Sequence, residues 1–414
     1  MPDLIKIAVR NLIRNWRRTF LTAGLITIGV LAVLLFTSLS GSFKSLMIGQ
    51  FTDSIMGHLE IHAKGYVASI DNLPLTLGMD AKMTERAEAV LKAAPDIVSY
   101  SPRVKFAAMF SNFAETTGVR VNGIDPEKEN ATLPLLKSRI TAGDPNGLLK
   151  PGQILIPDLL ANGMKVKIGD NVVLIATNKD GSVNGQTLVV HGILSGLNGP
   201  GGRDSYIHID DARHILRMTG AETNEIVVRI NQLGEVPQVI TDLNAAIVSD
   251  RAPDGNPLFE VHSWDQLSPF STVARMIDLL TLFVKIILVS IVLISVMNVM
   301  VMAVYERMRE IGTMAAIGTP PRRIMGLFLV EGLFLGVFGT LMGVVLSLGA
   351  IFLINLRTVT LAFGQQTNIV LAPTIGAWDV IIACLVVIVV AALASLQPAW
   401  KAARMDPIAA LRHV

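Results

Sequence analysis

Four apolar, charge-poor segments constrain the fold of this chain more than any other feature of its sequence. They cover residues 19–40, 279–305, 324–356 and 380–397. A helix needs roughly 20 apolar residues to cross the hydrocarbon core of a bilayer, and all four segments approach or exceed that length. The composition agrees, because 51% hydrophobic and 16% charged residues are unusual for a soluble protein. We therefore predict a membrane protein with four transmembrane helices.

The first segment could instead be the core of a cleaved signal peptide. Its apolar run exceeds the roughly 7–15 residues of such a core, and no small-residue cleavage site is apparent before Gly41. We expect an uncleaved anchor.

Basic residues set the orientation, because short loops rich in Lys and Arg stay in the cytoplasm. They gather before the first segment, between the second and third, and after the fourth. These residues are Lys6, Arg10, Arg14, Arg17, Arg18, Arg307, Arg309, Arg322, Arg323, Lys401, Arg404 and Arg412. Four spans bring all three places to one side. We thus predict a cytoplasmic amphipathic N-terminus, loop and tail at 1–18, 306–323 and 398–414, and outer regions at 41–278 and 357–379.

The large outer region has the pattern of a mixed α/β domain. Strand-like runs end at Gly, Asn and Asp turns, and two stretches have helical spacing. The expected strands are 119–124, 172–176, 188–193 and 225–230, the expected helices are 82–94 and 237–247, and a Gly/Asn-rich loop occupies 195–202. The predicted fold class is an α-helical membrane protein with a large mixed α/β extracytoplasmic domain between helices 1 and 2.

Motifs of catalysis and of tight metal binding are absent from the sequence. There is no Gly-Lys dipeptide for a Walker A loop, no His-Glu-x-x-His and no Gly-x-Ser-x-Gly. His58 and His62 could share a metal on a helix, but the alternating pattern around them favours a strand, and we expect surface or strand histidines. Cys384, the single cysteine, lies in an apolar run and reads as a core residue. The net charge of +2 is too small to indicate nucleic acid. We predict no catalytic residue, no metal site and no enzyme activity in this chain.

A short charged element separates the second and third apolar segments. Two acidic and two basic residues lie within little more than one helical turn from Glu306 to Glu310, where i, i+3 and i, i+4 pairs can form. Gly312 and Gly318 permit a tight turn, and Pro320–Pro321 can begin the next helix. The element could be a solvated loop that merely obeys the positive-inside rule. Its mixed charge and glycine spacing favour a docking element for a cytoplasmic protein.

Residues 305–320 resemble the signature of the FtsX-like permease family, which includes MacB-type efflux permeases and the LolC/LolE lipoprotein-release permeases. The tail at 397–412 is similar to the family's usual ending, and residues 121–126 and 159–170 resemble pieces of its outer domain. The resemblance covers essentially the whole chain in order, and its architecture is nearest to that of LolC/LolE.

The resemblance implies a permease subunit of an ABC transporter that works by mechanotransmission in the bacterial inner membrane, with a periplasmic domain. Two copies of a cytoplasmic ATPase would bind ATP and Mg, so we expect no cofactor in this chain. MacB-type permeases carry a fused N-terminal ATPase, whereas only residues 1–18 precede the first span here, so the ATPase should be a separate polypeptide. A second permease, identical or paralogous, completes the transporter. The outer domain should contain a β-rich insertion near 126–220.

The resemblance leaves three functions open. The leading one is movement of an amphiphile, above all lipoprotein release from the inner membrane. The second is efflux through a periplasmic adaptor and an outer-membrane channel. The third is regulation of an extracytoplasmic enzyme.

Candidate site residues fall into four groups. The ATPase-coupling residues are Glu306, Arg307, Arg309, Glu310, Ile311, Gly312 and Gly318. The candidates along the substrate path are Phe43, Met47, Leu34, Leu35, Leu282, Phe283 and Lys285. Gly332, Gly336, Gly339 and Gly343 form small-xxx-small pairs for close helix packing, within the subunit or at a dimer seam. Glu331, a carboxylate within the third span, should face protein or water.

Overall fold

The computed structural model describes residues 7, 10–14, 16–144, 149–195, 204–247, 257–268, 270–357, 359–363 and 366–406. Lys6, Arg412 and most of the 195–202 loop lie outside them. The chain divides into two compact units. We call the first the helical unit (residues 1–45, 274–359 and 370–414) and the second the α/β unit (residues 46–273 and 360–369).

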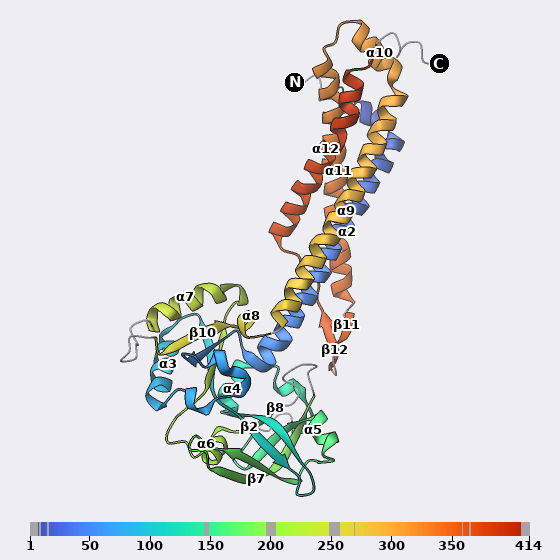
Figure 1. Cartoon of the computed structure of the whole chain (residues 1–414). Helices are drawn as coiled ribbons and strands as arrows, with labels where there is room; N and C mark the ends of the chain where they lie inside the picture. The colour runs from blue at the N-terminus through green and yellow to red at the C-terminus, as the bar shows by residue number, and fades with distance from the viewer. Residues whose placement is uncertain are drawn as a thin grey trace. The chain divides into compact units, whose positions relative to one another are not determined.

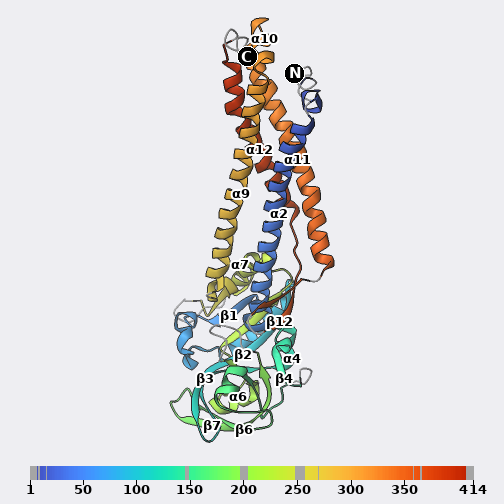
Figure 2. The same cartoon turned by 90° about the vertical axis from the view of Figure 1, so that its right-hand side faces the viewer.

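The helical unit is a bundle of long apolar helices. Its members are α2 (Trp16–Phe51), α9 (Phe270–Glu306), α10 (Met308–Ala316), α11 (Pro321–Leu356) and α12 (Ala377–Ala403). Four of these, all except the short α10, are long and apolar enough to cross a membrane. They run along one another in both views, and α2 begins and α12 ends at the same end of the bundle as α10 (Figures 1 and 2). This arrangement agrees with the predicted sidedness.

The helices are longer than the apolar segments that predicted them. The predicted boundary at residue 41 lies inside α2, which continues to Phe51, and α9 begins at Phe270 rather than at 279. At about 1.5 Å per residue, helices of 36 and 37 residues exceed the roughly 30 Å hydrocarbon core. Hydropathy detects only the apolar part of each helix, whereas the helix itself continues into the polar residues on either side.

The α/β unit is built on one ten-stranded sheet among the described residues, in the order β10-β1-β9-β2-β3-β8-β5-β7-β4, with β6 paired to β2 and β7. Most pairs are antiparallel, and β3–β8 and β5–β7 are parallel. The strands are β1 (Leu59–Ala63), β2 (Ile97–Ser111), β3 (Thr116–Ile124), β4 (Ile140–Gly143), β5 (Gln153–Pro157), β6 (Asn171–Thr177), β7 (Val183–Leu194), β8 (Asp204–His208), β9 (Glu225–Ile230) and β10 (Phe259–Ser263). The helices are α3 (Ala81–Ala93), α4 (Pro126–Thr132), α5 (Asp158–Gly163), α6 (Ile209–Leu216), α7 (Val236–Ile247) and α8 (Trp264–Leu267). The predicted mixed α/β class, its four strands and its two helices are confirmed.

Three hydrophobic cores pack on the sheet among the described residues, and two of them cover most of its strands. One joins β1, β9 and β10 to α3 and α7. The other joins the second half of β2 to β3, β5, β6, β7, β8, α5 and α6. The long strand β2 reaches both cores. The β-rich core includes the second half of β2 from Val104 onward, because its strands extend the existing sheet instead of forming a separate one. The β-rich insertion near 126–220 stays a prediction.

The predicted outer loop at 357–379 contains a hairpin that sequence reasoning did not anticipate. Its strands are β11 (Val359–Phe363) and β12 (Gln366–Leu371), which pair with each other.

Candidate functional site: the α9–α10–α11 connection and its charged residues

The charged element folds into a short amphipathic helix between two spans. Arg307 breaks the helix after α9, with φ −111° and ψ 19°, and α10 begins at the next residue. Ile311 and Gly312 face the core of the helical unit and are buried. Gly318 adopts φ +86°, a left-handed conformation that favours glycine, so the chain can reverse before α11 starts at Pro321. The result is a compact, turn-limited helix with one exposed face.

A chain of ion pairs ties α10 to two other parts of the bundle. Arg14 donates from Nη2 to Glu310 Oε1 at 2.5 Å, and Arg307 donates from Nε to Glu310 Oε2 at 3.0 Å. Arg307 Nη1 also lies 3.0 Å from Glu331 Oε2 on α11. Partial burial raises the pKa of the Glu310 carboxyl, but hydrogen bonds from Arg307 and Arg14 outweigh it and hold that pKa below its ordinary value. Glu310 therefore stays ionised between two guanidinium groups.

The Arg307–Glu331 pair is buried inside the helical unit. Only 8% of Arg307 and 7% of Glu331 are exposed, and the guanidinium also lies 5.6 Å from the ring centre of Phe328. A buried charge is tolerated when it is paired and hydrogen-bonded, as here. Glu331 thus faces protein rather than lipid. Its partner is Arg307, which the sequence analysis had assigned to ATPase coupling.

The predicted coupling residues therefore divide into two sets. Arg307, Ile311 and Gly312 are buried in the bundle, so their predicted part in coupling would be to hold α10 in place and not to contact the ATPase directly. The reason is that α10 packs one side onto the bundle core. The exposed set is Glu306, Arg309, Glu310 and Gly318, which adjoin the exposed Thr313 and Ile317.

The four glycines of α11 lie at contacts within the subunit and face two different helices. A Cβ at Gly332 would overlap Ser395 on α12, and one at Gly336 would lie 2.8 Å from Ala391 Cβ on the same helix. Cβ atoms at Gly339 and Gly343 would lie 2.7 and 2.6 Å from the Cβ atoms of Ile26 and Val30 on α2. Helices can approach this closely only where one side chain is missing.

Two substrate-path candidates are buried within this chain. Leu34 is 1% exposed in the core of the helical unit, and Met47 is 3% exposed. Neither side chain is accessible to an acyl chain in this chain. The sequence does not show which face of each helix is covered by its neighbours. Leu282 and Phe283 are 52% and 61% exposed, and Phe43, Leu35 and Lys285 are half-buried.

A buried cluster of charged residues in the α/β unit escaped sequence reasoning. It lies where β1, β2, β9 and α4 meet and consists of Glu60, His62, Arg103, Lys105, Glu129 and Glu225. Arg103 contacts Glu129 at 2.5 Å and Glu225 at 3.1 Å, and Lys105 Nζ lies 3.2 Å from Glu225. The available signal was the alternation of polar residues at 60/62 and 103/105, which places each pair on one face of a strand.

His62 completes the charge balance of this cluster. Its Nε2 lies 3.2 Å from Glu60 Oε2 and 3.9 Å from Glu225 Oε2. His62 lies on a strand, which is one of the two expected settings, and its side chain is fully buried there. Burial lowers the pKa of His62, but the two carboxylates outweigh that effect and raise it to about 9. Three carboxylates then face an arginine, a lysine and an imidazolium.

The donor set Glu60, His62 and Glu225 has the spacing of a metal site, with its ligand atoms within 4.8 Å of one another. However, Arg103 and Lys105 already hold Glu225, and a divalent ion would add two charges to a balanced cluster. We interpret the cluster as an ion-pair network that joins β1, β2, β9 and α4.

Comparison with known proteins decides the family. Residues 19–246, more than half of the chain, match the MacB-like periplasmic core domain, and residues 282–407 match the FtsX-like permease C-terminal domain. The chain belongs to the FtsX-like/MacB-type permease family. The permease is 27% identical to the lipoprotein-releasing system transmembrane protein LolC of Neisseria meningitidis serogroup B, over 97% of this chain and 96% of that protein. It is 25% identical to the macrolide export ATP-binding/permease protein MacB of Chlorobium phaeobacteroides, over 98% of this chain and 60% of that protein.

The periplasmic region of MacB from Actinobacillus actinomycetemcomitans, a crystal structure, aligns with 53% of this permease and 92% of that chain, at 13% identity and a TM-score of 0.34. The family match identifies the α/β unit as a periplasmic domain between the first and second spans. The protein is an ABC transporter permease of the FtsX/MacB/LolC type, a membrane protein with a periplasmic domain.

Proposed function

We propose that this permease couples ATP hydrolysis by a separate cytoplasmic ATPase to release of lipoproteins from the inner membrane. The observation that carries the proposal is the alignment with LolC, which spans nearly the full length of both chains and so includes both the periplasmic domain and the membrane helices. MacB-type efflux is the second candidate, because the MacB alignment also spans almost all of this chain.

The exposed face of α10 is the proposed ATPase contact. Arg309 is exposed on this helix, and the exposed Glu306 and Ile317 flank it at the end of α9 and just after α10. Arg307 and Arg14 tie the helix to the bundle. Because α10 is held by ion pairs on two sides, a displacement of α10 by the ATPase would be passed on to the membrane helices. We expect two ATPase copies, one on each of two permeases, with ATP and Mg bound by the ATPase.

Charge reversal at Arg309 tests this contact. Arg309→Glu should leave expression and folding intact and detach or uncouple the ATPase, because rim charges govern complementarity at interfaces. Lys401→Glu is the matched control, since Lys401 is also exposed near the end of a span but lies on α12. A complex with Arg309→Glu that assembles and hydrolyses ATP like the wild type would contradict the docking assignment.

The proposed route of the cargo is lateral, along the outer half of the spans. Leu282 and Phe283 expose large apolar side chains on α9, suited to acyl chains. A photo-crosslinker at Phe283 should therefore capture lipoprotein, whereas one at Met325, near the cytoplasmic end of α11, should not. Equal capture at Met325 would favour a path across the whole membrane.

Reconstitution separates the candidate functions. The permease, its ATPase and a triacylated lipoprotein in proteoliposomes should give ATP-dependent transfer to a soluble acceptor. Purification of the complex from native membranes provides the second readout. Recovery of an adaptor with an outer-membrane channel would favour efflux, and recovery of a cell-wall hydrolase would favour regulation of an extracytoplasmic enzyme.

A further inference from the structure

The end of α2 is enclosed by the α/β unit. After Phe51 the chain continues as one π-helical turn, Thr52–Met56, and this turn belongs to the α/β unit together with the last residues of α2. Thr52 and Ser54 in the turn are 2% and 0% exposed. π-Helical turns are rare in proteins and occur frequently at functional sites. We call the side chains and backbone groups that contact this turn the α2 grip.

The first side of the α2 grip comes from β1 and β9. Arg229 Nη1 on β9 lies 2.8 Å from Asp53 Oδ1, and His58 Nε2, just before β1, lies 3.6 Å from the same oxygen. His58 is held to β9 in turn, because its Nδ1 accepts the Ile230 N–H at 3.2 Å. Both strands belong to the core that contains α3 and α7, which we call the α3/α7 half of the unit. This side therefore attaches the turn to the α3/α7 half.

The second side comes from the segment before β4 and from the end of β7. Arg139 donates from Nη1 to the Ser54 carbonyl at 3.4 Å and from Nη2 to the Ser195 carbonyl at 3.2 Å. Ser195 directly follows β7 and donates its own N–H to the Arg139 carbonyl at 2.6 Å, and the Leu135 N–H donates to the Asp53 carbonyl at 3.0 Å. The strands β4 and β7 pair with each other, and β7 belongs to the β-rich core. This side therefore attaches the turn to the β-rich half.

Arg139 is a buried cation that binds backbone oxygens. It is 1% exposed, and among the described residues its partners are carbonyl oxygens rather than carboxylates. Burying a charge costs free energy, but the last carbonyls of a helix lack partners within the helix and carry partial negative charge. The planar guanidinium presents several donors in a fixed geometry and so reaches two acceptors at once. Arg139 thus fixes the end of α2 and the end of β7 to one point.

The sheet is discontinuous between the two halves. The long strand β2 belongs to both, but its pairing with β9 ends at Arg103 and its pairing with β6 begins at Met109. Along residues 104–108, one edge of β2 therefore has no neighbouring strand among the described residues. Fewer ladder hydrogen bonds oppose a twist of one half against the other at this place.

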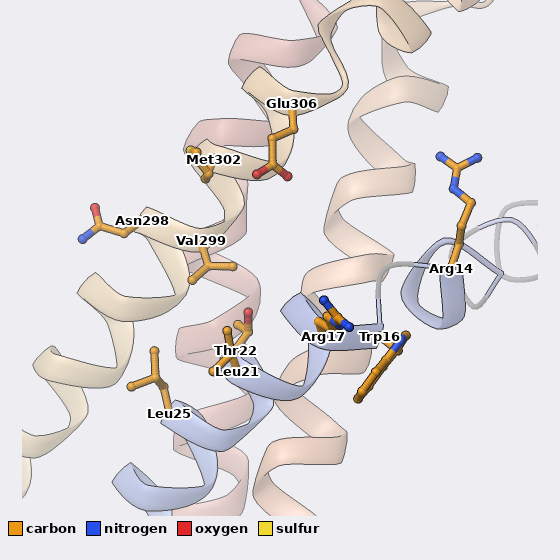
Figure 3. A pocket seen from close by; sticks show the side chains of 10 residues that line it. All are labelled: Arg14, Trp16, Arg17, Leu21, Thr22, Leu25, Asn298, Val299, Met302 and Glu306. Atoms are coloured by element: carbon orange, nitrogen blue, oxygen red, sulfur yellow. The ribbon is translucent and has the colours of Figure 1, made fainter.

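At its other end, α2 lies close to the coupling helix and stands apart from α9. Arg14, which precedes α2, contacts Glu310 on α10. A groove of about 610 Å³ separates α2 from α9 there, and it is lined by Leu25 on α2 and Val299 on α9, among others (Figure 3). A displacement of α10 can therefore reach α2 through Arg14, without passing through α9.

We propose that the α2 grip passes a displacement of α2 on to both halves of the α/β unit and turns them relative to each other, with Arg139 as the positioning residue. This inference rests on the proposed function, in which an ATPase drives α10. The grip holds the side chain of Asp53 on one side and the carbonyl of Ser54 on the other. Because these groups belong to one helical turn but are bound by different halves, a rotation of α2 moves the two halves in different directions about β2.

The distance between the two halves tests the proposal. The full-length permease, with Cys384→Ser, carries spin labels on cysteines at Ala89 on α3 and Thr187 on β7, which are exposed positions outside the grip. Complexes with the ATPase and a single labelled permease are assembled in nanodiscs. Double electron–electron resonance then compares the nucleotide-free state with the state trapped by ATP and vanadate. We expect trapping to change the distance in the parent protein and Arg139→Met to abolish this change.

Two further variants and one control separate coupling from folding. Arg139→Lys keeps the buried charge without the planar fork, and it should keep the fold and lose part of the distance change. Asp53→Asn weakens the other side of the grip and should also reduce the change. Arg120→Met is the matched control, because Arg120 pairs with Asp204 at 2.7 Å in the same unit and does not contact the turn. Thermal unfolding of each protein checks its fold, and the Lys and Asn variants decide the test if Arg139→Met does not fold.

Transport per ATP gives a second readout that a purely structural defect would not move. In proteoliposomes, Arg139→Met should lower lipoprotein release per ATP hydrolysed at least about five-fold, the lower end of typical coupling between distant sites, while hydrolysis continues. A distance change in Arg139→Met equal to that of the parent protein would overturn the proposal, and so would a parent protein without any change. A normal distance change in complexes that release no lipoprotein would support the grip and refute lipoprotein as the cargo.

Discussion

The buried Arg307–Glu331 pair gives the sharpest prediction for stability. Arg307→Gln leaves the Glu331 carboxylate buried without its cation, a change that typically costs about 3–5 kcal/mol. Glu331→Gln should cost less, about 2 kcal/mol, because Arg307 keeps Glu310 at 3.0 Å and the ring of Phe328. The double variant leaves two amides and no buried charge, and it should be no less stable than Arg307→Gln alone. The coupling free energy between the two sites should then be at least about 2 kcal/mol.

Unfolding in mixed micelles measures these values. Helicity is followed by circular dichroism as the fraction of denaturing detergent increases. A thiol-reactive dye on the single, half-buried Cys384 reports opening of the bundle without introduced cysteines. Lys44→Gln and Asp278→Asn form the control cycle, because this ion pair is more exposed, with 29% and 58% of its side chains accessible. It should show a coupling below about 1 kcal/mol. Additive effects at Arg307 and Glu331 would refute the view that each buried charge depends on the other.

Three further predictions follow from the structure. Gly339→Leu should destabilise the bundle by at least about 2 kcal/mol in the same detergent titration, since its Cβ would lie 3.0 Å from a backbone oxygen of α2, while Gly349→Leu, which meets no atom within 4 Å, should change it little; equal effects would contradict the packing. The His62 imidazolium, with its pKa raised to about 9 from an ordinary 6.5, should stabilise the folded protein fully below pH 6.5 and lose up to about 3 kcal/mol as pH rises through 9; thermal unfolding from pH 6 to 9.5 should show this loss, and a His62→Gln variant with the same slope would exclude this origin. After Cys384→Ser, a cysteine at Val183 should react with an impermeant maleimide from outside in spheroplasts and one at Gly318 should not; the reverse would overturn the topology.

The sequence was sufficient for the membrane architecture because lipid imposes a strict condition on it. A span must be apolar and long, and short basic loops must stay inside, so four spans and their sidedness followed from composition along the chain. The ends of the helices did not follow. Residues 41–51 contain no proline, and α2 continues through them, past Gly41 and Gly49, beyond the apolar segment.

The sites were less predictable, because burial depends on neighbours that are distant in sequence. Arg307 and Arg309 look equivalent in the sequence, yet Arg307 is the one that forms a buried ion pair with Glu331, 24 residues further along the chain. Leu34 and Phe283 were chosen for the same reason, but α2 turns Leu34 into the core whereas α9 exposes Phe283. The ion-pair network around Glu225 required strands from positions 60, 103 and 225 to lie side by side. Local pattern shows a polar face on each strand but not which faces meet.

The placement of Arg307 also determines how displacement passes through the molecule. This residue is the only one between α9 and α10, where the helical path is interrupted, and a flexible joint would be expected there. Its side chain instead bridges Glu310 on α10 and Glu331 on α11. Any rotation of α10 away from α11 would separate charges in a region of low dielectric, so small movements of α10 are stiffly resisted. A movement imposed on α10 would therefore displace α11 as well, and the glycine contacts of α11 would carry α2 and α12 with it. The ion pairs of Arg307 therefore stiffen the point where the helix is interrupted.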